Sequence, residues 1–155
     1  MANQSNIFIS HRHEDDALVD RLKKMLTKNG ADIRDSSITR QTPNNAKSQD
    51  YIKKILADQI RWAGKIIVII SPDTKNHPWV DWEIKYARKF KNKRIIGVWA
   101  PDAAHDNMPD GIRDYADALV DWNSQKIIDA LNEQDIWTEP NGGQAPVQCI
   151  KHIHC

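Results

Sequence analysis

Hydrophobic and polar positions follow two different rhythms along this chain. Unbroken apolar runs at residues 6–10, 65–71 and 94–100 are typical of strands that are covered on both faces. Shorter runs at residues 31–34 and 118–122 predict two more strands. Between these runs, apolar residues recur three and four positions apart. This spacing predicts helices over residues 14–28, 49–62, 79–92 and 124–132, with a short helical turn at 111–115.

The boundaries of these elements are marked by turn-forming residues. Asn29-Gly30 ends the first helix, because glycine accepts the left-handed conformation that follows many helices. Ser48 is the expected N-cap of the helix over residues 49–62. Residues 35–47 form a polar loop rich in turn formers, and long ordered loops are often functional.

Strands that alternate with helices predict βαβ units, and therefore an α/β fold with a parallel sheet covered by helices on both faces. The periodic pattern ends at Glu133 and gives way to a stretch rich in Gly, Pro and Asn. We therefore expect one domain over residues 1–133, followed by a tail over residues 134–155 that lies outside the main core.

Composition limits the function classes. The chain has 155 residues with 22 Lys and Arg against 21 Asp and Glu, which argues against a nucleic acid or an anionic membrane as the partner. No apolar run is long enough for a membrane span, and the first residues do not resemble a signal peptide. The two cysteines, Cys149 and Cys155, both stand near the end of the chain, so a reducing cytoplasm is the expected location.

The C-terminal stretch contains four side chains that bind metals in other proteins. They are Cys149, His152, His154 and Cys155. Zinc sites usually draw ligand pairs from separate loops, whereas these four are compressed at one end of the chain. This spacing favours a disordered tail over a zinc site, and we expect no bound metal.

One carboxylate stands out in the helix predicted over residues 79–92. On a helical wheel, Glu83 lies in the middle of the apolar side, close to Trp79 and Trp82, whereas Lys85 lies on the polar side. An ionised carboxylate is rarely placed there, because its removal from water is costly unless a partner compensates it. Glu83 is therefore a candidate catalytic group. The alternative is a structural ion pair with Arg12 or a lysine.

Other polar residues are predicted to gather near Glu83. Ligands of open parallel sheets bind beyond the carboxyl ends of the strands. Ser10 and His11 follow the first strand, Ser71 follows the central one, and the loop 35–47 follows the second. Asp15 and Asp16 are interpreted as acids that favour the N-terminus of the first helix. No glycine-rich phosphate loop follows a strand, and Ser71 stands where a phosphate-accepting receiver domain would carry an aspartate.

Several segments in this order resemble the boxes of TIR domains. The similarity covers about residues 6–132 and is closest to the bacterial TIR-like proteins of the Thoeris anti-phage defence type. It is carried by the first strand with the acids after it, by the central strand, by the start of the Glu83 helix and by the next strand. These segments are residues 7–11 and 14–16, residues 66–72, residues 79–84 and residues 94–98.

The resemblance implies a flavodoxin-like three-layer sandwich around a five-stranded parallel sheet. It implies an enzyme that cleaves NAD+ at the bond between nicotinamide and ribose, with Glu83 at the position of the family's catalytic glutamate. NAD+ is then a substrate and no cofactor is expected. The product would be a cyclic or modified ADP-ribose that activates a separate effector, with self-association and a phage-derived trigger as further expected partners.

One carboxylate suffices for this reaction, because nicotinamide is already cationic in NAD+ and leaves as a neutral base. Glu83 would stabilise the oxocarbenium-like transition state. Trp79 or Trp82 would stack on nicotinamide, and Arg12 or Arg40 would pair with the pyrophosphate. Ser10, His11 and Ser71 would bond ribose or phosphate oxygens. The expected substrate-binding residues are thus Phe8, Ser10, His11, Arg12, Arg40, Ser71, Trp79 and Trp82.

Two other functions fit the same sequence. One is a non-catalytic TIR module that signals by self-association, with the loop 35–47 as its contact surface. The other is a nucleotide sensor that binds without turnover. Incubation of concentrated protein with NAD+ and separation of the products would distinguish the three.

Overall fold

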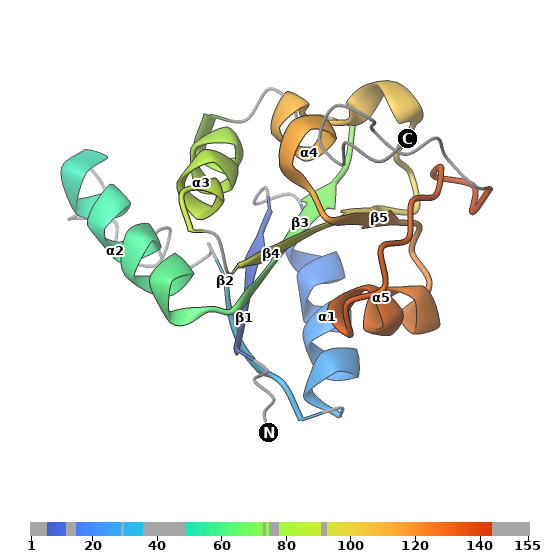
Figure 1. Ribbon diagram of the computed structural model, residues 1–155, viewed down its shortest axis with the longest axis horizontal. Helices are drawn as coiled ribbons and strands as arrows, with labels where there is room; N and C mark the ends of the chain where they lie inside the picture. Colours follow the sequence, from blue (N-terminus) through green and yellow to red (C-terminus); the bar gives the residue numbers. More distant parts are fainter. Residues whose placement is uncertain are drawn as a thin grey trace.

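The computed structural model describes residues 6–11, 15–28, 30–35, 49–72, 74, 78–90 and 93–143. These residues form a five-stranded sheet in the order β2-β1-β3-β4-β5, and every pair of neighbouring strands is parallel (Figure 1). The strands are β1 (Asn6–Ser10), β2 (Asp32–Asp35), β3 (Lys65–Ile70), β4 (Arg94–Trp99) and β5 (Ala118–Val120). The predicted α/β fold, flavodoxin-like with a five-stranded parallel sheet, is confirmed.

Helices cover both faces of this sheet. In Figure 1, α2, α3 and α4 lie on one side of the strands, and α1 and α5 lie on the other. Their bounds are α1 (Asp16–Thr27), α2 (Gln49–Trp62), α3 (Pro78–Arg88), α4 (Asp110–Tyr115) and α5 (Ser124–Leu131), with a short 3₁₀ helix η4 (His105–Asn107) before α4. Each predicted helix is therefore present, and the layers are helix, sheet and helix.

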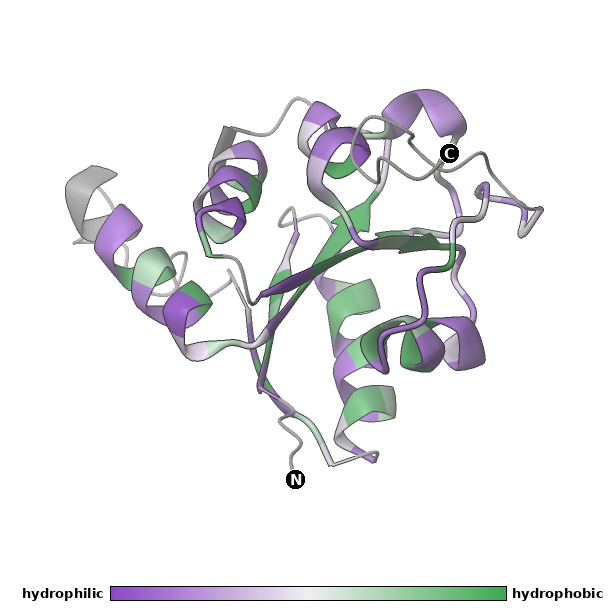
Figure 2. Cartoon of the chain, viewed as in Figure 1, coloured by the Kyte–Doolittle hydropathy of each residue, from purple (hydrophilic) through white to green (hydrophobic). Residues whose placement is uncertain are grey.

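Alternation along the strands divides the core into two halves. In β3, Ile66 and Val68 face α2, α3 and α4, whereas Ile67 and Ile69 face α1 and α5. All four side chains are buried. Because successive side chains of a strand point to opposite faces, an unbroken apolar run serves both halves at once. Figure 2 shows largely green strands between helices that carry both green and purple residues.

Two glycines fit the places where the chain turns or packs closely. Gly30 follows α1 with a φ of +86°, as predicted from Asn29-Gly30, because this conformation strains other residues. Gly111 begins α4 against α3, and a Cβ atom on it would stand 2.8 Å from Cγ2 of Ile84. The absence of a side chain at Gly111 therefore lets α4 lie directly against the helix that carries Glu83.

The last turns of α2 and α3 are fastened in different ways. α3 ends at Arg88, before the predicted residue 92, because the N–H groups of Lys89 and Phe90 bond three residues back to Tyr86 and Ala87. At the end of α2, Nζ of Lys93 donates to the carbonyl oxygens of Ala63 and Arg61. Partial burial lowers the pKa of Lys93 from its ordinary value of 10.5.

The prediction that residues 134–155 lie outside the main core is wrong for Ile136, Trp137 and Thr138. Trp137 is 4% exposed and belongs to the core half that faces α2, α3 and α4. The backbone joins the edge of β5, since the N–H of Leu119 bonds to Ile136 O at 2.8 Å and the N–H of Thr138 bonds to Leu119 O at 2.7 Å. Periodicity could not reveal this segment, because its pairing is irregular and its partner is distant in the sequence.

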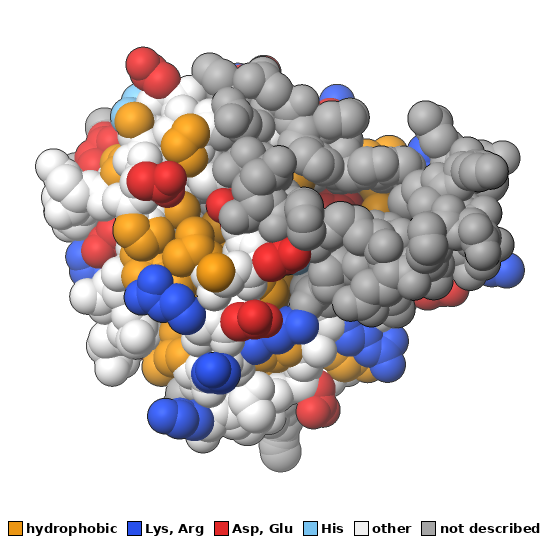
Figure 3. Space-filling model, turned by 180° about the vertical axis from the view of Figure 1, so that it is seen from behind, with side chains coloured by type: hydrophobic (Ala, Val, Ile, Leu, Met, Phe, Trp, Pro, Cys, Tyr) orange, Lys and Arg blue, Asp and Glu red, His pale blue; other side chains and the backbone are white. Residues whose placement is uncertain are grey.

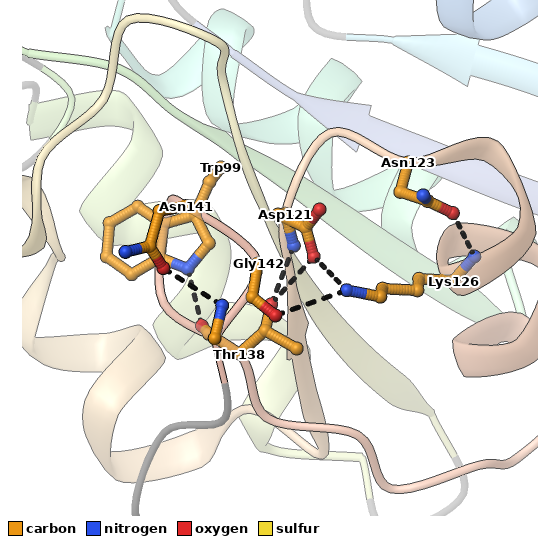
Figure 4. Close-up of polar contacts among 8 residues, drawn as sticks. Trp99, Asp121, Asn123, Lys126, Thr138, Asn141 and Gly142 are labelled. Carbon is orange, nitrogen blue, oxygen red and sulfur yellow. Dashed lines mark hydrogen bonds and ion pairs between the residues drawn. The ribbon is translucent and has the colours of Figure 1, made fainter.

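Side chains also fasten this segment, which we call the C-terminal clasp (residues 136–143). Trp99 Nε1 donates to Thr138 O at 2.8 Å, and Lys126 Nζ donates to Asp121 Oδ1 at 2.9 Å and to Gly142 O at 3.4 Å (Figure 4). Thr138 Oγ1 accepts from the N–H of Asp121 at 2.8 Å. The clasp is thus part of the fold, whereas the four metal-capable residues from 149 to 155 lie outside the described residues.

The described surface carries charges of both signs. Figure 3 shows acidic and basic side chains interspersed on the face opposite to that of Figure 1. Among the described residues, no helix is long and apolar enough to cross a membrane.

Candidate functional site

Glu83 lies in the second turn of α3 and is buried, with 1% of its surface exposed. Val80, Ile84 and Ala87 on the same side of α3 belong to the core. On the other side, Lys85 pairs with Asp81 at 3.1 Å, and both side chains are largely exposed. The predicted placement of Glu83 on the apolar side of its helix is therefore what the structure has.

The side chain of Glu83 is held by a residue from the first strand. Ser10 Oγ donates a hydrogen bond to Glu83 Oε1. Ser10 follows Phe8 by two positions, so both side chains point to the sheet face that α3 covers. Hydrogen bonds to a carboxylate are shorter and stronger than neutral ones. The contact therefore fixes one oxygen of Glu83 at the carboxyl end of β1.

A tight turn follows β3 at the same edge of the sheet. The N–H of Ser71 donates to Thr74 Oγ1 at 2.8 Å, and the N–H of Thr74 donates to Ser71 O at 3.0 Å. Thr74 Oγ1 also donates to Ile69 O at 3.2 Å. Hydroxyl side chains that bond to nearby backbone groups stabilise such turns. This turn sets the direction in which the chain leaves β3 on its way to α3.

Asp15 is a second buried carboxylate at this edge. It is 6% exposed, and its Oδ2 accepts a hydrogen bond from Ser71 Oγ at 2.7 Å. Asp15 occupies the N-cap position of α1, yet its side chain makes no capping hydrogen bond there. The interpretation of Asp15 as an acid that serves its own helix missed this contact. No local signal reveals it, because 56 residues separate the two partners.

His11 and Asp16 lie beside one another just after β1. The His11 side chain is fully buried, and its Nδ1 is 3.5 Å from Asp16 Oδ1. This is an ion pair when the imidazole is protonated. Asp16 is 44% exposed, so the pair joins a buried ring to a carboxylate at the surface.

An aromatic column runs along α3 next to Glu83. Trp82 stacks on Tyr86 with ring centroids 5.1 Å apart and planes 11° apart, and Tyr86 meets Phe90 edge-on at 5.5 Å. Arg61 Nη1 donates to the hydroxyl of Tyr86 at 2.8 Å. One face of the Trp82 ring is thus covered by Tyr86, and a ligand ring would have to use the other face.

The structure brings some predicted residues together and places others apart. Ser10 meets Glu83, and Ser71 stands in the turn before α3. Phe8 is fully buried within the apolar core. Arg12, Arg40 and the side chain of Trp79 lie outside the described residues. The predicted contacts of all eight residues with a substrate stay predictions.

Metal binding has no visible candidate in the described part of the chain. No group of three or more His, Cys, Asp or Glu side chains is placed there to hold an ion. The described residues at this edge of the sheet carry carboxylate, hydroxyl and aromatic side chains. We call it the rim, defined by Ser10, Asp15, Ser71, Thr74, Trp82 and Glu83.

The neighbouring loop after β4 also reaches the rim. Asn107 Nδ2 donates to Pro72 O at 3.1 Å, which ties the loop after β4 to the loop after β3. Further along, His105 Nδ1 lies 2.7 Å from Glu139 Oε1 and so connects this loop to the C-terminal clasp. The described loops at the carboxyl ends of β3 and β4 therefore support one another.

Comparison with known proteins gives a match to a family model and matches to solved structures. A family model described as Thoeris protein ThsB, TIR-like domain, matches residues 8–105, which include Ser10, Ser71 and Glu83. Among solved structures, a 2-deoxyribosyltransferase from the psychrotolerant bacterium Bacillus psychrosaccharolyticus is similar with a TM-score of 0.60 and 14% identity, over 77% of this chain and 89% of that chain. At this identity the likeness shows a common fold alone. No curated protein matches the chain.

Proposed function

The chain belongs to the family of Thoeris ThsB TIR-like domains of anti-phage defence, and we propose that it cleaves NAD+ between nicotinamide and ribose. The single observation that carries this proposal is the buried carboxylate of Glu83, held by Ser10 at the carboxyl end of the sheet. Ligands of open parallel sheets bind at that end. A buried carboxylate at such a place is a functional candidate on physical grounds.

The proposed reaction needs a fixed negative charge next to the ribose, and the carboxylate of Glu83 supplies it. Nicotinamide carries a positive charge in NAD+ and departs as a neutral ring, so its departure needs no proton donor. The ribose left behind gains positive charge at its anomeric carbon. A fixed carboxylate stabilises that charge, and its effect is largest where water is excluded. Ser10 supports this role, because its hydrogen bond holds Glu83 Oε1 in one position before the reaction begins.

Water that attacks the anomeric carbon gives ADP-ribose, and attack by a group of the same molecule gives a cyclic product. Trp82 is the aromatic residue of the rim that offers a ring to the cationic nicotinamide, through the face opposite to Tyr86. In the cytoplasm of the cell, the product would act on a separate effector. NAD+ is consumed in this scheme, so no additional cofactor takes part.

The test is nicotinamide release by concentrated wild-type protein and by a Glu83→Gln variant. Glutamine keeps the shape of the side chain and removes its charge, so we expect release to fall by about a hundredfold or more. The matched control is Glu133→Gln. Glu133 is exposed and interacts with Lys65, at the start of β3 and therefore at the opposite end of the sheet. Equal rates for wild type and Glu83→Gln would contradict the proposal and favour a module that signals by self-association.

A further inference from the structure

The hydrogen bonds of the rim have a fixed direction. A serine hydroxyl has one proton and two lone pairs, and an ionised carboxylate can only accept. Ser71 Oγ donates a hydrogen bond to Asp15 Oδ2 at 2.7 Å, and Ser10 Oγ donates one to Glu83 Oε1. Toward any further partner, both serine oxygens therefore act as hydrogen-bond acceptors.

Two neighbours of Ser71, Asp15 and Thr74, determine where its hydroxyl proton points. Its oxygen lies 3.0 Å from Thr74 Oγ1, and either atom can be the donor in that contact. Thr74 Oγ1 also has a backbone acceptor, Ile69 O, at 3.2 Å. Without Asp15, the Ser71 proton could turn to Thr74 or to a ligand. Asp15 removes that freedom, because a carboxylate is the stronger acceptor.

The position of Asp15 in the sequence would allow it to cap α1. It occupies the N-cap position of α1, where an aspartate usually bonds to the backbone of its own helix, but its side chain makes no such bond. Asp15 is instead buried, and it accepts a hydrogen bond from the hydroxyl of Ser71, which follows β3. Ser10 is the last residue of β1 and Asp15 directly precedes α1, so two residues close in the sequence hold Glu83 and Ser71.

We infer that Asp15 is a positioning residue that turns Ser71 Oγ into an acceptor for a hydroxyl group of the ligand's sugar. The pyrophosphate oxygens of a dinucleotide are ionised at neutral pH and can only accept, so they do not match an acceptor. Ribose hydroxyls can donate and do match. The inference rests on the proposed function for the identity of the sugar, which is the ribose next to nicotinamide, and it narrows the earlier expectation that Ser71 binds ribose or phosphate oxygens.

The experiment measures binding without chemistry. The probe is carba-NAD+, in which a methylene group replaces the ring oxygen of the nicotinamide ribose so that no oxocarbenium ion forms. Its affinity is measured by calorimetry, together with the affinities of its 2′-deoxy and 3′-deoxy forms. The proteins are wild type, Asp15→Asn and Ser71→Ala, with Asp20→Asn as the matched control because Asp20 is exposed on the same helix. Thermal melting verifies that each variant is folded.

We expect wild type to bind one of the two deoxy forms about three to ten times more weakly than carba-NAD+, the size of a single hydrogen bond. Ser71→Ala should show the same loss with carba-NAD+ and no further loss with that deoxy form. Asp15→Asn keeps an amide oxygen that accepts from Ser71 Oγ less strongly than a carboxylate does, so it should show a smaller loss of the same kind. A merely structural role of Asp15 would lower the melting temperature and weaken all three probes equally. Should Asp15→Asn not fold, Asp15→Glu takes its place, because glutamate keeps the charge but displaces the oxygen that accepts from Ser71, and a loss of the same kind is expected.

The inference would be overturned if the substitution and the missing hydroxyl each weakened binding by the same factor whether or not the other change was present. So would equal binding of all three probes by wild type, or no binding of carba-NAD+ at all. The proposed function fails by a different result, which is nicotinamide release unaffected by Glu83→Gln. The two failures are therefore distinguishable.

Discussion

The rim and the C-terminal clasp use buried polar groups in different ways. In the rim, both carboxylates accept hydrogen bonds from hydroxyl side chains, Glu83 from Ser10 and Asp15 from Ser71. In the clasp, side chains bond mainly to backbone, as Trp99 does with Thr138 O and Lys126 with Gly142 O. Bonds to backbone fix the path of the chain, whereas bonds between side chains fix the direction of functional groups. We therefore expect substitutions in the clasp to change stability most and substitutions in the rim to change the proposed activity most.

The largest expected effect is in the clasp. Trp137→Ala removes a large buried side chain from the core, and we expect a loss of about 3–5 kcal/mol in the free energy of unfolding. Urea denaturation measures this loss. Nicotinamide release per folded molecule should remain within about twofold of wild type. A variant that is as stable as wild type would show that Trp137 is not part of the core.

The next effect is in the rim, where we expect the activity to change more than the stability. Ser10→Ala removes the hydrogen bond that holds Glu83 Oε1, and we expect kcat for nicotinamide release to fall about tenfold. KM should change little, because the substrate contacts remain. Ser10→Thr, which keeps the hydroxyl, should recover part of the rate. A raised KM with an unchanged kcat would mean that Ser10 binds substrate rather than orienting Glu83.

The smallest effect tests one hydroxyl of the clasp. Thr138→Val keeps the shape of the side chain but leaves the partly buried N–H of Asp121 without the acceptor that Thr138 Oγ1 provides. We expect a loss of about 1 kcal/mol in the free energy of unfolding, measured by urea denaturation. Thr138→Ser is the control and should lose less. An effect on kcat larger than the effect on stability would break the division between clasp and rim.

Local pattern predicted the elements well. The apolar runs became β1, β3 and β4, and the helical spacing became α1, α2 and α5 within a few residues of the expected bounds. These elements follow from contacts that recur every two or every three to four residues, which a sequence displays directly. The burial of Glu83 was predictable for the same reason, because its position on the wheel of α3 is a local property.

By itself, then, the sequence determined the parallel α/β fold, the similarity to TIR domains and the buried carboxylate of α3. Tertiary structure alone decided which groups meet that carboxylate and its neighbours. Ser10 stands 73 residues from Glu83, and Asp15 stands 56 residues from Ser71. Trp137 likewise pairs with Leu119 of β5 at the sheet edge, 18 residues away in the sequence. Such partners depend on strand order and on the direction of each side chain, which no local spacing encodes, since they arise when the whole sheet is assembled.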